Sequence, residues 1–274
     1  MPELTTLLPM LAMLLLAGAF AGLMAGLLGV GGGIILVPAY YYIFSTLGHG
    51  GDQLMQVCLA TSLATIIITS MRSVSSHHKK GAVDWAILRS FAPGIVAGAI
   101  AGVFVAALLR STQLQAIFGV LGITVGFYLA FGRASWRLGD RMPTGGRSIG
   151  ISSFIGFLSV LMGIGGGSFA VPTMSLFSVP IHRAVATAAG FGVLIAVPSV
   201  AGFLLVEIPD HSRPPFSIGA VNIPAFIVTI SMTLITAPYG AKLAHKLNAK
   251  ILKRIFAVFL ITIALNMLRK ALGY

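Results

Sequence analysis

Residues 22–38 read GLMAGLLGVGGGIILVP, and residues 156–172 read GFLSVLMGIGGGSFAVP. The two stretches are separated by a constant offset of 134 residues (165 − 31). Each interrupts a long apolar run with a glycine cluster that is followed by a proline. When both halves of a membrane protein contain such an interrupted helix, the interruptions are the best indication in the sequence of a transport site.

The composition is typical of a chain that lies in lipid. Hydrophobic residues make up 57% of the 274 residues and charged residues 9%, and the mean hydropathy is +0.98. A soluble domain carries about 25% charged residues, so this chain cannot cover a water-facing surface. The net charge of +12 lies in loops, which favours a membrane topology signal over nucleic-acid binding. We predict an all-α polytopic membrane protein.

Ten apolar runs follow one another along the chain, and each predicts a helix. The runs cover residues 5–28, 34–47, 54–74, 85–109, 114–131, 149–162, 169–179, 184–206, 223–247 and 252–268. The second and seventh runs are shorter than the roughly 20 residues that a straight transmembrane helix needs. We therefore expect half-helices in these two places, and eight to ten transmembrane segments in total.

The similarity between the halves extends beyond the glycines. Residues 59–61 (LAT) match residues 185–187 (VAT), and residues 81–83 (GAV) match residues 219–221 (GAV). Self-similarity of this kind predicts two homologous repeats. The predicted division is a first transmembrane repeat at 1–132, a cytoplasmic connector at 133–147 and a second transmembrane repeat at 148–274.

The Lys and Arg positions predict the orientation. If all ten runs cross with both termini outside, all but four of the 18 Lys and Arg residues lie on the inner side. Five crossings per repeat is an odd number, so the two repeats would be inverted relative to each other. If the short runs re-enter without crossing, this argument for inversion weakens. The predicted location is the cytoplasmic (inner) membrane.

The glycine clusters are the candidate site. Consecutive glycines destabilise a helix by about 1 kcal/mol each relative to alanine, and backbone released from a helix in the membrane must find other partners. The restarted helices would present unpaired N–H groups to an anion. The candidate glycines are Gly31, Gly32, Gly33, Gly165, Gly166 and Gly167. Pro38 and Pro172 are expected near the first turn of each restarted helix, where a missing N–H is tolerated.

An alternative interpretation is that the glycines only allow close helix packing. The occurrence of two matched clusters, each with a proline at the same distance, favours a site. A dinucleotide fingerprint is excluded because the G-x-G-x-x-G spacing and a strand–helix unit are both missing.

Acidic residues are absent from the middle of every predicted span. The six acids are Glu3, Asp52, Asp84, Asp140, Glu207 and Asp210, and all fall in loops or at helix ends. A buried acid usually holds a cation or relays protons in a membrane. A small anion is therefore the better candidate substrate, and no metal site or cofactor is expected.

Several side chains are secondary candidates. The hydroxyls of Thr61 and Thr187 occupy matched positions and could donate to an oxyanion, or could bond to their own helix backbone. Ser168 could bind the anion or cap the restarted helix; Ile34 stands at its equivalent position. His182 and Arg183 form a candidate gate at the inner mouth or, alternatively, an interfacial anchor. We also expect His77–Lys80 in a cytoplasmic loop, Asp84 and Asn222 as helix caps, and Tyr40–Tyr42 in an interfacial aromatic belt.

The two strings GVGGGIILVP (29–38) and GIGGGSFAVP (163–172) closely resemble the signature of the sulfite exporter TauE/SafE family, also called the toluene sulfonate uptake permease family. The matched AT pairs at 60–61 and 186–187 and the two GAV strings are similar to it as well. The resemblance covers nearly the whole chain. It implies a secondary transporter of sulfite, sulfoacetate, another organosulfonate or a related organic anion.

The leading hypothesis is a secondary transporter that works by alternating access, with the lipid bilayer and a small anionic substrate as its partners. A proton or sodium coupling ion and a homo-oligomer are left open by the sequence. An anion channel with the same pore chemistry is the main alternative. An intramembrane enzyme is disfavoured, because no Asp, Glu or His cluster lies within the spans.

Overall fold

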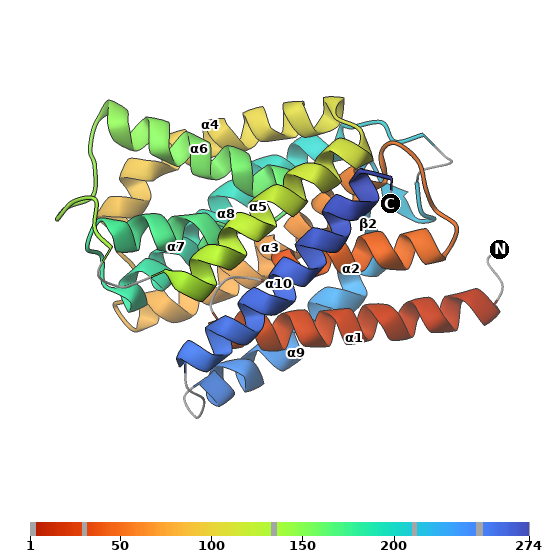
Figure 1. The fold of residues 1–274 in the computed structure, drawn as a ribbon, viewed down its shortest axis with the longest axis horizontal. Coiled ribbons are helices and arrows are strands. Elements are labelled where there is room, and N and C mark those ends of the chain that lie inside the picture. Colours follow the sequence, from red (N-terminus) through yellow and green to blue (C-terminus); the bar gives the residue numbers. More distant parts are fainter. Residues whose placement is uncertain (1–3, 29–31, 133–135, 210–212, 245–248, 274) are drawn as a thin grey trace.

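The computed structural model describes residues 4–28, 32–132, 136–209, 213–244 and 249–273. Within these ranges the chain forms ten helices and one short β-hairpin (Figure 1). The helices are α1 (Leu4–Leu28), α2 (Gly33–Thr46), α3 (Leu54–Lys79), α4 (Trp85–Leu108), α5 (Ser111–Phe131), α6 (Gly146–Leu161), α7 (Gly167–Leu176), α8 (Ile181–Leu204), α9 (Ile223–Ala244) and α10 (Ala249–Ala271). Strands β1 (Ser217–Ile218) and β2 (Val221–Asn222) pair in antiparallel fashion before α9.

The fold confirms the prediction of an all-α polytopic membrane protein. Six of the described helices are long and apolar enough to cross a bilayer. Three of the ten described helices are short: α2 has 14 residues, α6 has 16 and α7 has 10. At 1.5 Å of rise per residue, none of the three reaches across the roughly 30 Å hydrocarbon core.

Several predicted boundaries differ from the structure by about three residues, and α6 begins at Gly146, inside the predicted connector 133–147. The largest error is at the end of α3. Helix α3 extends to Lys79, so His77, His78 and Lys79 form its last turn and not a loop. These basic side chains lie where the partial negative charge of the helix C-terminus favours cations. The helix end was predicted from the end of the apolar run, and a polar last turn lies beyond that run.

The largest helix–helix interfaces all join the first half of the chain to the second. They are formed by α1 with α9, α4 with α6, α5 with α10 and α3 with α8. In two related halves, α1–α5 correspond in order to α6–α10. The α1–α9 pair then corresponds to the α6–α4 pair, whereas the α5–α10 and α3–α8 pairs each correspond to themselves. This is the contact pattern expected of two related, interlocked halves. The division into repeats at 1–132 and 148–274 stays a prediction.

The directions of the helices agree with an inverted arrangement (Figure 1). In this view α1 runs leftward from the right-hand end of the bundle, whereas α6 runs rightward from the left-hand end. Helices α5 and α10 also run in opposite directions, and the start of α1 and the end of α10 lie at the same end.

Small residues explain how the matched pairs approach so closely. A β-carbon at Gly18 of α1 would lie 2.9 Å from the Cα of Thr229 in α9. On the equivalent pair, Gly102 of α4 would place a β-carbon 2.9 Å from the Cβ of Val160 in α6. Because lipid tails are as apolar as side chains, close packing of this type is what holds membrane helices together.

The prediction for the three tyrosines was wrong for Tyr40. Its side chain is fully buried, and its hydroxyl shares a hydrogen bond of 2.6 Å with the hydroxyl of Thr229. Tyr41 and Tyr42 are only partly buried, and the ammonium group of Lys270 lies over both rings, at 5.3 and 4.4 Å from their centroids. These two rings, unlike that of Tyr40, lie next to the last turn of α10.

Candidate functional site: the two helix breaks and the cavity at α7

The two helix breaks lie against each other inside the bundle. A β-carbon at Gly33, the first residue of α2, would lie 2.7 Å from the carbonyl oxygen of Gly163, in the break before α7. It would also lie 3.1 Å from the Cα of Ile164. Such distances are below normal van der Waals contact, so only glycine at position 33 lets the two backbone segments approach this closely.

A side chain from α3 fixes the second break. The hydroxyl of Ser62 donates a hydrogen bond of 2.7 Å to the carbonyl oxygen of Gly163. Gly163 has a φ of +62°, which L-residues with a β-carbon seldom adopt. The glycine thus supplies the turn, and Ser62 satisfies a carbonyl that the interrupted helix leaves without a partner.

The start of α2 is filled by protein. The N–H groups of Ile35 and Leu36 both bond to the carbonyl of Gly32, at 3.0 and 3.1 Å. Ile34 is 2% exposed and belongs to the hydrophobic core. Gly31, the remaining candidate of the first cluster, lies outside the described residues.

The start of α7 opens onto a cavity of about 100 Å³. The first N–H in α7 that bonds within the turn is that of Ala170, which donates to the carbonyl of Gly166 at 2.8 Å. The N–H groups of the preceding residues lack helical partners, as at the start of any helix. The cavity lies between α5, α7 and α8 and is lined by Val125, Tyr128, Leu129, Gly167, Ser168, Val171, Pro172, Ser175, Ile181 and Val185.

Two serine hydroxyls in this cavity are buried without a partner. Ser168 is 4% exposed, and in the described part of the chain its hydroxyl makes no hydrogen bond. The hydroxyl of Ser175, two turns further along α7, is equally unsatisfied. Because Gly166 is the N-cap and no side chain caps this helix, the alternative role of Ser168 as a cap is wrong.

A buried hydroxyl without a partner is costly, by about 1 to 3 kcal/mol. Such a group calls for a water molecule or a ligand. None of the ten lining residues is charged. The polar groups that face the cavity are therefore hydroxyls together with the positive end of α7, an arrangement that suits an anion.

Both prolines lie deeper in their helices than predicted. Pro38 and Pro172 are each the sixth residue of their helix and not part of its first turn. The helices begin earlier than expected, because Gly32 and Gly166 already accept bonds from the residues that follow. Pro172 lines the cavity and has no N–H to donate to the carbonyl of Ser168, four residues earlier.

Thr61 and Thr187 bond across the repeats instead of to their own helices. The hydroxyl of Thr61 accepts a 3.0 Å hydrogen bond from the backbone N–H of Asn222. The hydroxyl of Thr187 accepts a 2.9 Å bond from the backbone N–H of Asp84. Both threonines are fully buried, and neither is among the residues described as lining the cavity. Their binding to a ligand stays a prediction.

The two residues that the threonines hold are helix caps, as predicted. A carboxylate oxygen of Asp84 accepts from the N–H groups of Ala86 and Ile87, at 3.1 and 3.2 Å. The side-chain oxygen of Asn222 accepts from the N–H of Ala225 at 3.0 Å. These caps start α4 and α9, which are corresponding helices of the two halves.

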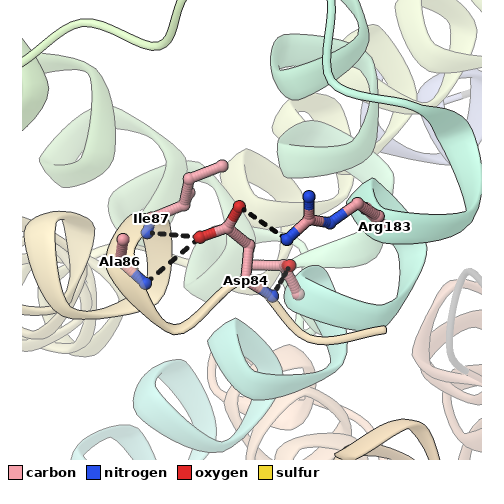
Figure 2. A network of polar contacts seen from close by, with 5 residues as sticks. Asp84, Ala86, Ile87 and Arg183 are labelled. Atoms are coloured by element: carbon pink, nitrogen blue, oxygen red, sulfur yellow. Dashed lines mark hydrogen bonds and ion pairs between the residues drawn. The ribbon is translucent and has the colours of Figure 1, made fainter. Parts of the chain in front are cut away.

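The candidate gate residues lie in the first turn of α8. Arg183 forms an ion pair with Asp84, with 3.2 Å between a guanidinium nitrogen and the carboxylate oxygen (Figure 2). His182 is exposed. The sequence alone did not identify Asp84 as the partner of Arg183.

The structure brings Gly167, Ser168 and Pro172 together at the cavity, whereas Gly165 and Gly166 lie behind it against Ile66 and Phe191. The sequence interpretation missed Ser175 and Tyr128. Ser175 had a detectable signal, because a residue seven positions after Ser168 lies on the same helix face. Tyr128 comes from α5, and no local pattern connects it to α7.

The sequence model of the family described as sulfite exporter TauE/SafE matches residues 14–267. The chain belongs to this family. The match spans α1 to α10 and includes both breaks, so the family fold is present from the first helix to the last.

Relatives of the chain are named as membrane transporters. A probable membrane transporter protein of Haemophilus influenzae is 33% identical over 257 residues, which cover 93% of this chain and 97% of the relative. One from Methanocaldococcus jannaschii is 27% identical over 94% of this chain and 96% of its own length. A third, from Bacillus subtilis, is 28% identical over 93% and 96%. No solved structure matches the chain. This TauE/SafE protein is thus a multi-pass membrane transporter.

Proposed function

We propose that this TauE/SafE protein is a secondary transporter of a small sulfur oxyanion, sulfite or a short organosulfonate such as sulfoacetate, across the cytoplasmic membrane. The oxyanion binds at the start of α7. The N–H groups of Gly167 and Ser168 and the hydroxyl of Ser168 hold its oxygens, while the remaining glycines of the two clusters shape the breaks.

The observation that carries the proposal is the hydroxyl of Ser168. It is buried at the positive end of a short helix, its residue lines a cavity, and it has no partner within the described residues. Hydrogen bonds to charged groups contribute about 1.5 to 3 kcal/mol, so an anion at this point would convert an unfavourable burial into a favourable contact. The family description supports the sulfur chemistry of the substrate.

The apolar wall of the cavity suits the organic part of a sulfonate. Val171 and Leu129 offer apolar surface along the same cavity, and Ser175 provides a second hydroxyl about 10 Å along α7 from Ser168. An inorganic anion would use only the polar groups at Ser168. A short organosulfonate would also use the apolar surface, and a longer one would reach Ser175.

The proposed mechanism is alternating access, and the interlocked halves support it. The matched helix pairs α1–α9 and α4–α6 allow one set of helices to rock against the other around the two breaks. In this proposal both termini face the outside of the cell, and a proton or sodium ion is the candidate for coupling.

The test is transport by purified protein in proteoliposomes. Uptake of labelled sulfite should be inhibited by unlabelled sulfite and by sulfoacetate, and less by carboxylate analogues. Ser168→Ala should raise the KM at least about tenfold, because it removes one hydrogen bond to a charged group. Ser231→Ala, at an exposed serine of α9, is the matched control and should leave uptake unchanged. Normal uptake by the Ser168→Ala variant would refute the site.

The same vesicles distinguish a transporter from an anion channel. Unlabelled substrate on the far side should accelerate uptake of label by a transporter, because exchange is faster than return of the empty carrier. A channel would instead show a current that follows the voltage and no such stimulation.

A further inference from the structure

Asp84 connects the turn between α3 and α4 to the first turns of α8 through two separate contacts (Figure 2). One carboxylate oxygen pairs with Arg183, at 3.2 Å. The other accepts from the N–H groups of Ala86 and Ile87 and caps α4. The backbone N–H of Asp84 donates to the hydroxyl of Thr187, one turn beyond Arg183.

The opposite end of the molecule repeats this construction without the ion pair. Asn222 corresponds to Asp84, caps α9 in the same way, and donates its N–H to Thr61, the counterpart of Thr187. The offset that pairs Thr187 with Thr61 also pairs Arg183 with Val57. Val57 is a fully buried apolar residue and cannot form an ion pair. At this end, the bond that corresponds to the Asp84–Thr187 bond is therefore not accompanied by an ion pair.

The ion pair lies behind a wall of the cavity. Ile181 and Val185, on either side of Arg183 in α8, both line the cavity next to α7. A residue two positions away on a helix faces roughly the opposite direction. Arg183 is thus held by Asp84 from behind, while its neighbours form the cavity wall.

We propose that the Asp84–Arg183 pair is a one-sided latch, which holds the first turn of α8 against the α3–α4 turn and so restricts movement of the cavity wall at that end. The end that Asn222 and Val57 occupy has no such latch. If the two halves exchange conformations during transport, the conformation with the Asp84 end closed gains an ion pair that the other lacks. This inference assigns an intrinsic bias to the transporter under Proposed function, and so rests on that function for its meaning.

The molecule itself supplies the test variants. Asp84→Asn copies the residue at the equivalent cap and can still cap α4, so it removes the charge and not the helix start. Arg183→Val copies Val57. Asp52→Asn is the matched control, because the Asp52–Arg110 pair is loose, with 4.0 Å between its atoms and both side chains 73% exposed.

The readout is the modification rate of a cysteine in the cavity wall, measured with an uncharged methanethiosulfonate reagent on the full-length protein in detergent. The protein carries Val185→Cys, with the buried native thiol removed by Cys58→Ala. Asp84→Asn and Arg183→Val should each raise the rate by about two- to fivefold, the range that a partly exposed ion pair supports. The double variant should show no further increase, and Asp52→Asn should show none.

Salt provides a readout that a purely structural role would not change. Raising ionic strength from 0.05 to 0.5 M screens exposed charges, so it should accelerate modification in the protein with the intact pair and leave the Asp84→Asn variant unaffected. Equal rates with and without the pair, or equal salt dependence, would overturn the latch. Labelling needs no substrate, so failure of the latch and failure of the proposed transport are observed separately.

Discussion

The two helix breaks differ in what surrounds the helix that follows each of them. The first leads into α2, where Ile34 packs into the core and Gly33 lies against the backbone of the other break. The second leads into α7, where Ser168 occupies the position equivalent to Ile34 and faces a cavity with an unsatisfied hydroxyl.

This difference shows how related segments can take separate tasks. The first break supports the second mechanically, because its glycine allows the close contact with Gly163. The second break keeps its polar groups available. Under the proposed function, one side chain at one position is enough to distinguish a packing element from a binding element.

The largest expected effect tests whether the close contact between the two breaks requires glycine at position 163. Gly163→Ala should lower stability by about 2 to 4 kcal/mol, because a β-carbon at φ +62° would also lie 2.7 Å from the side chain of Val37. The melting temperature in detergent measures this, with Gly50→Ala, which has nothing within 4 Å, as control. Equal melting temperatures for the two variants would contradict the close contact of the breaks.

The next effect separates binding from packing. Ser168→Ala should weaken substrate binding by about 1.5 to 3 kcal/mol without lowering stability, because no hydrogen bond of the empty protein is lost. Ile34→Ser should do the reverse: lower the melting temperature and leave the substrate KM unchanged. Substrate affinity and melting temperature, measured for both variants, test this prediction. If the two variants lost affinity and stability to the same extent, the distinction between the breaks would be wrong.

A smaller effect concerns the bonds that hold the two caps. Thr61→Val should destabilise the protein by about 1 to 3 kcal/mol, because the fully buried N–H of Asn222 loses its acceptor. Thr187→Val should cost less, because Asp84 is only partly buried and has Arg183 as a second contact with α8. Melting temperatures of the two variants give the comparison, and a larger loss for Thr187→Val would argue against it.

The smallest effect refines the shape of the site. Ser175→Ala should reduce the affinity for a sulfonate with a polar tail by about threefold, and leave that for sulfite unchanged, because only a longer ligand reaches the second hydroxyl. Competition by a series of sulfonates of increasing length measures this. Equal losses for sulfite and the longer sulfonates would place the ligand elsewhere in the cavity.

Much of the fold could be predicted because lipid imposes a simple pattern. All ten apolar runs are helices, including the short ones at α2 and α7. The errors fall where the pattern gives no signal: the polar last turn of α3, and the depth of Pro38 and Pro172 in their helices. The position of Tyr40 was predicted wrongly because three consecutive tyrosines in a helix point in different directions, and the sequence does not show which of them faces the core.

For the site, the sequence by itself determined the membrane class, the two breaks and the unequal pair Ile34 and Ser168, because these depend on composition, spacing and residue type. Only the tertiary structure decided that Ser168 faces a cavity, that Thr61 and Thr187 hold caps in the opposite half, and that Arg183 pairs with Asp84. The physical reason is the distance along the chain. The contacts of Thr61, Thr187 and Arg183 join residues about a hundred or more positions apart, and only the packing of one half against the other brings them together. The cavity at Ser168 likewise exists only because α5, α7 and α8 pack together.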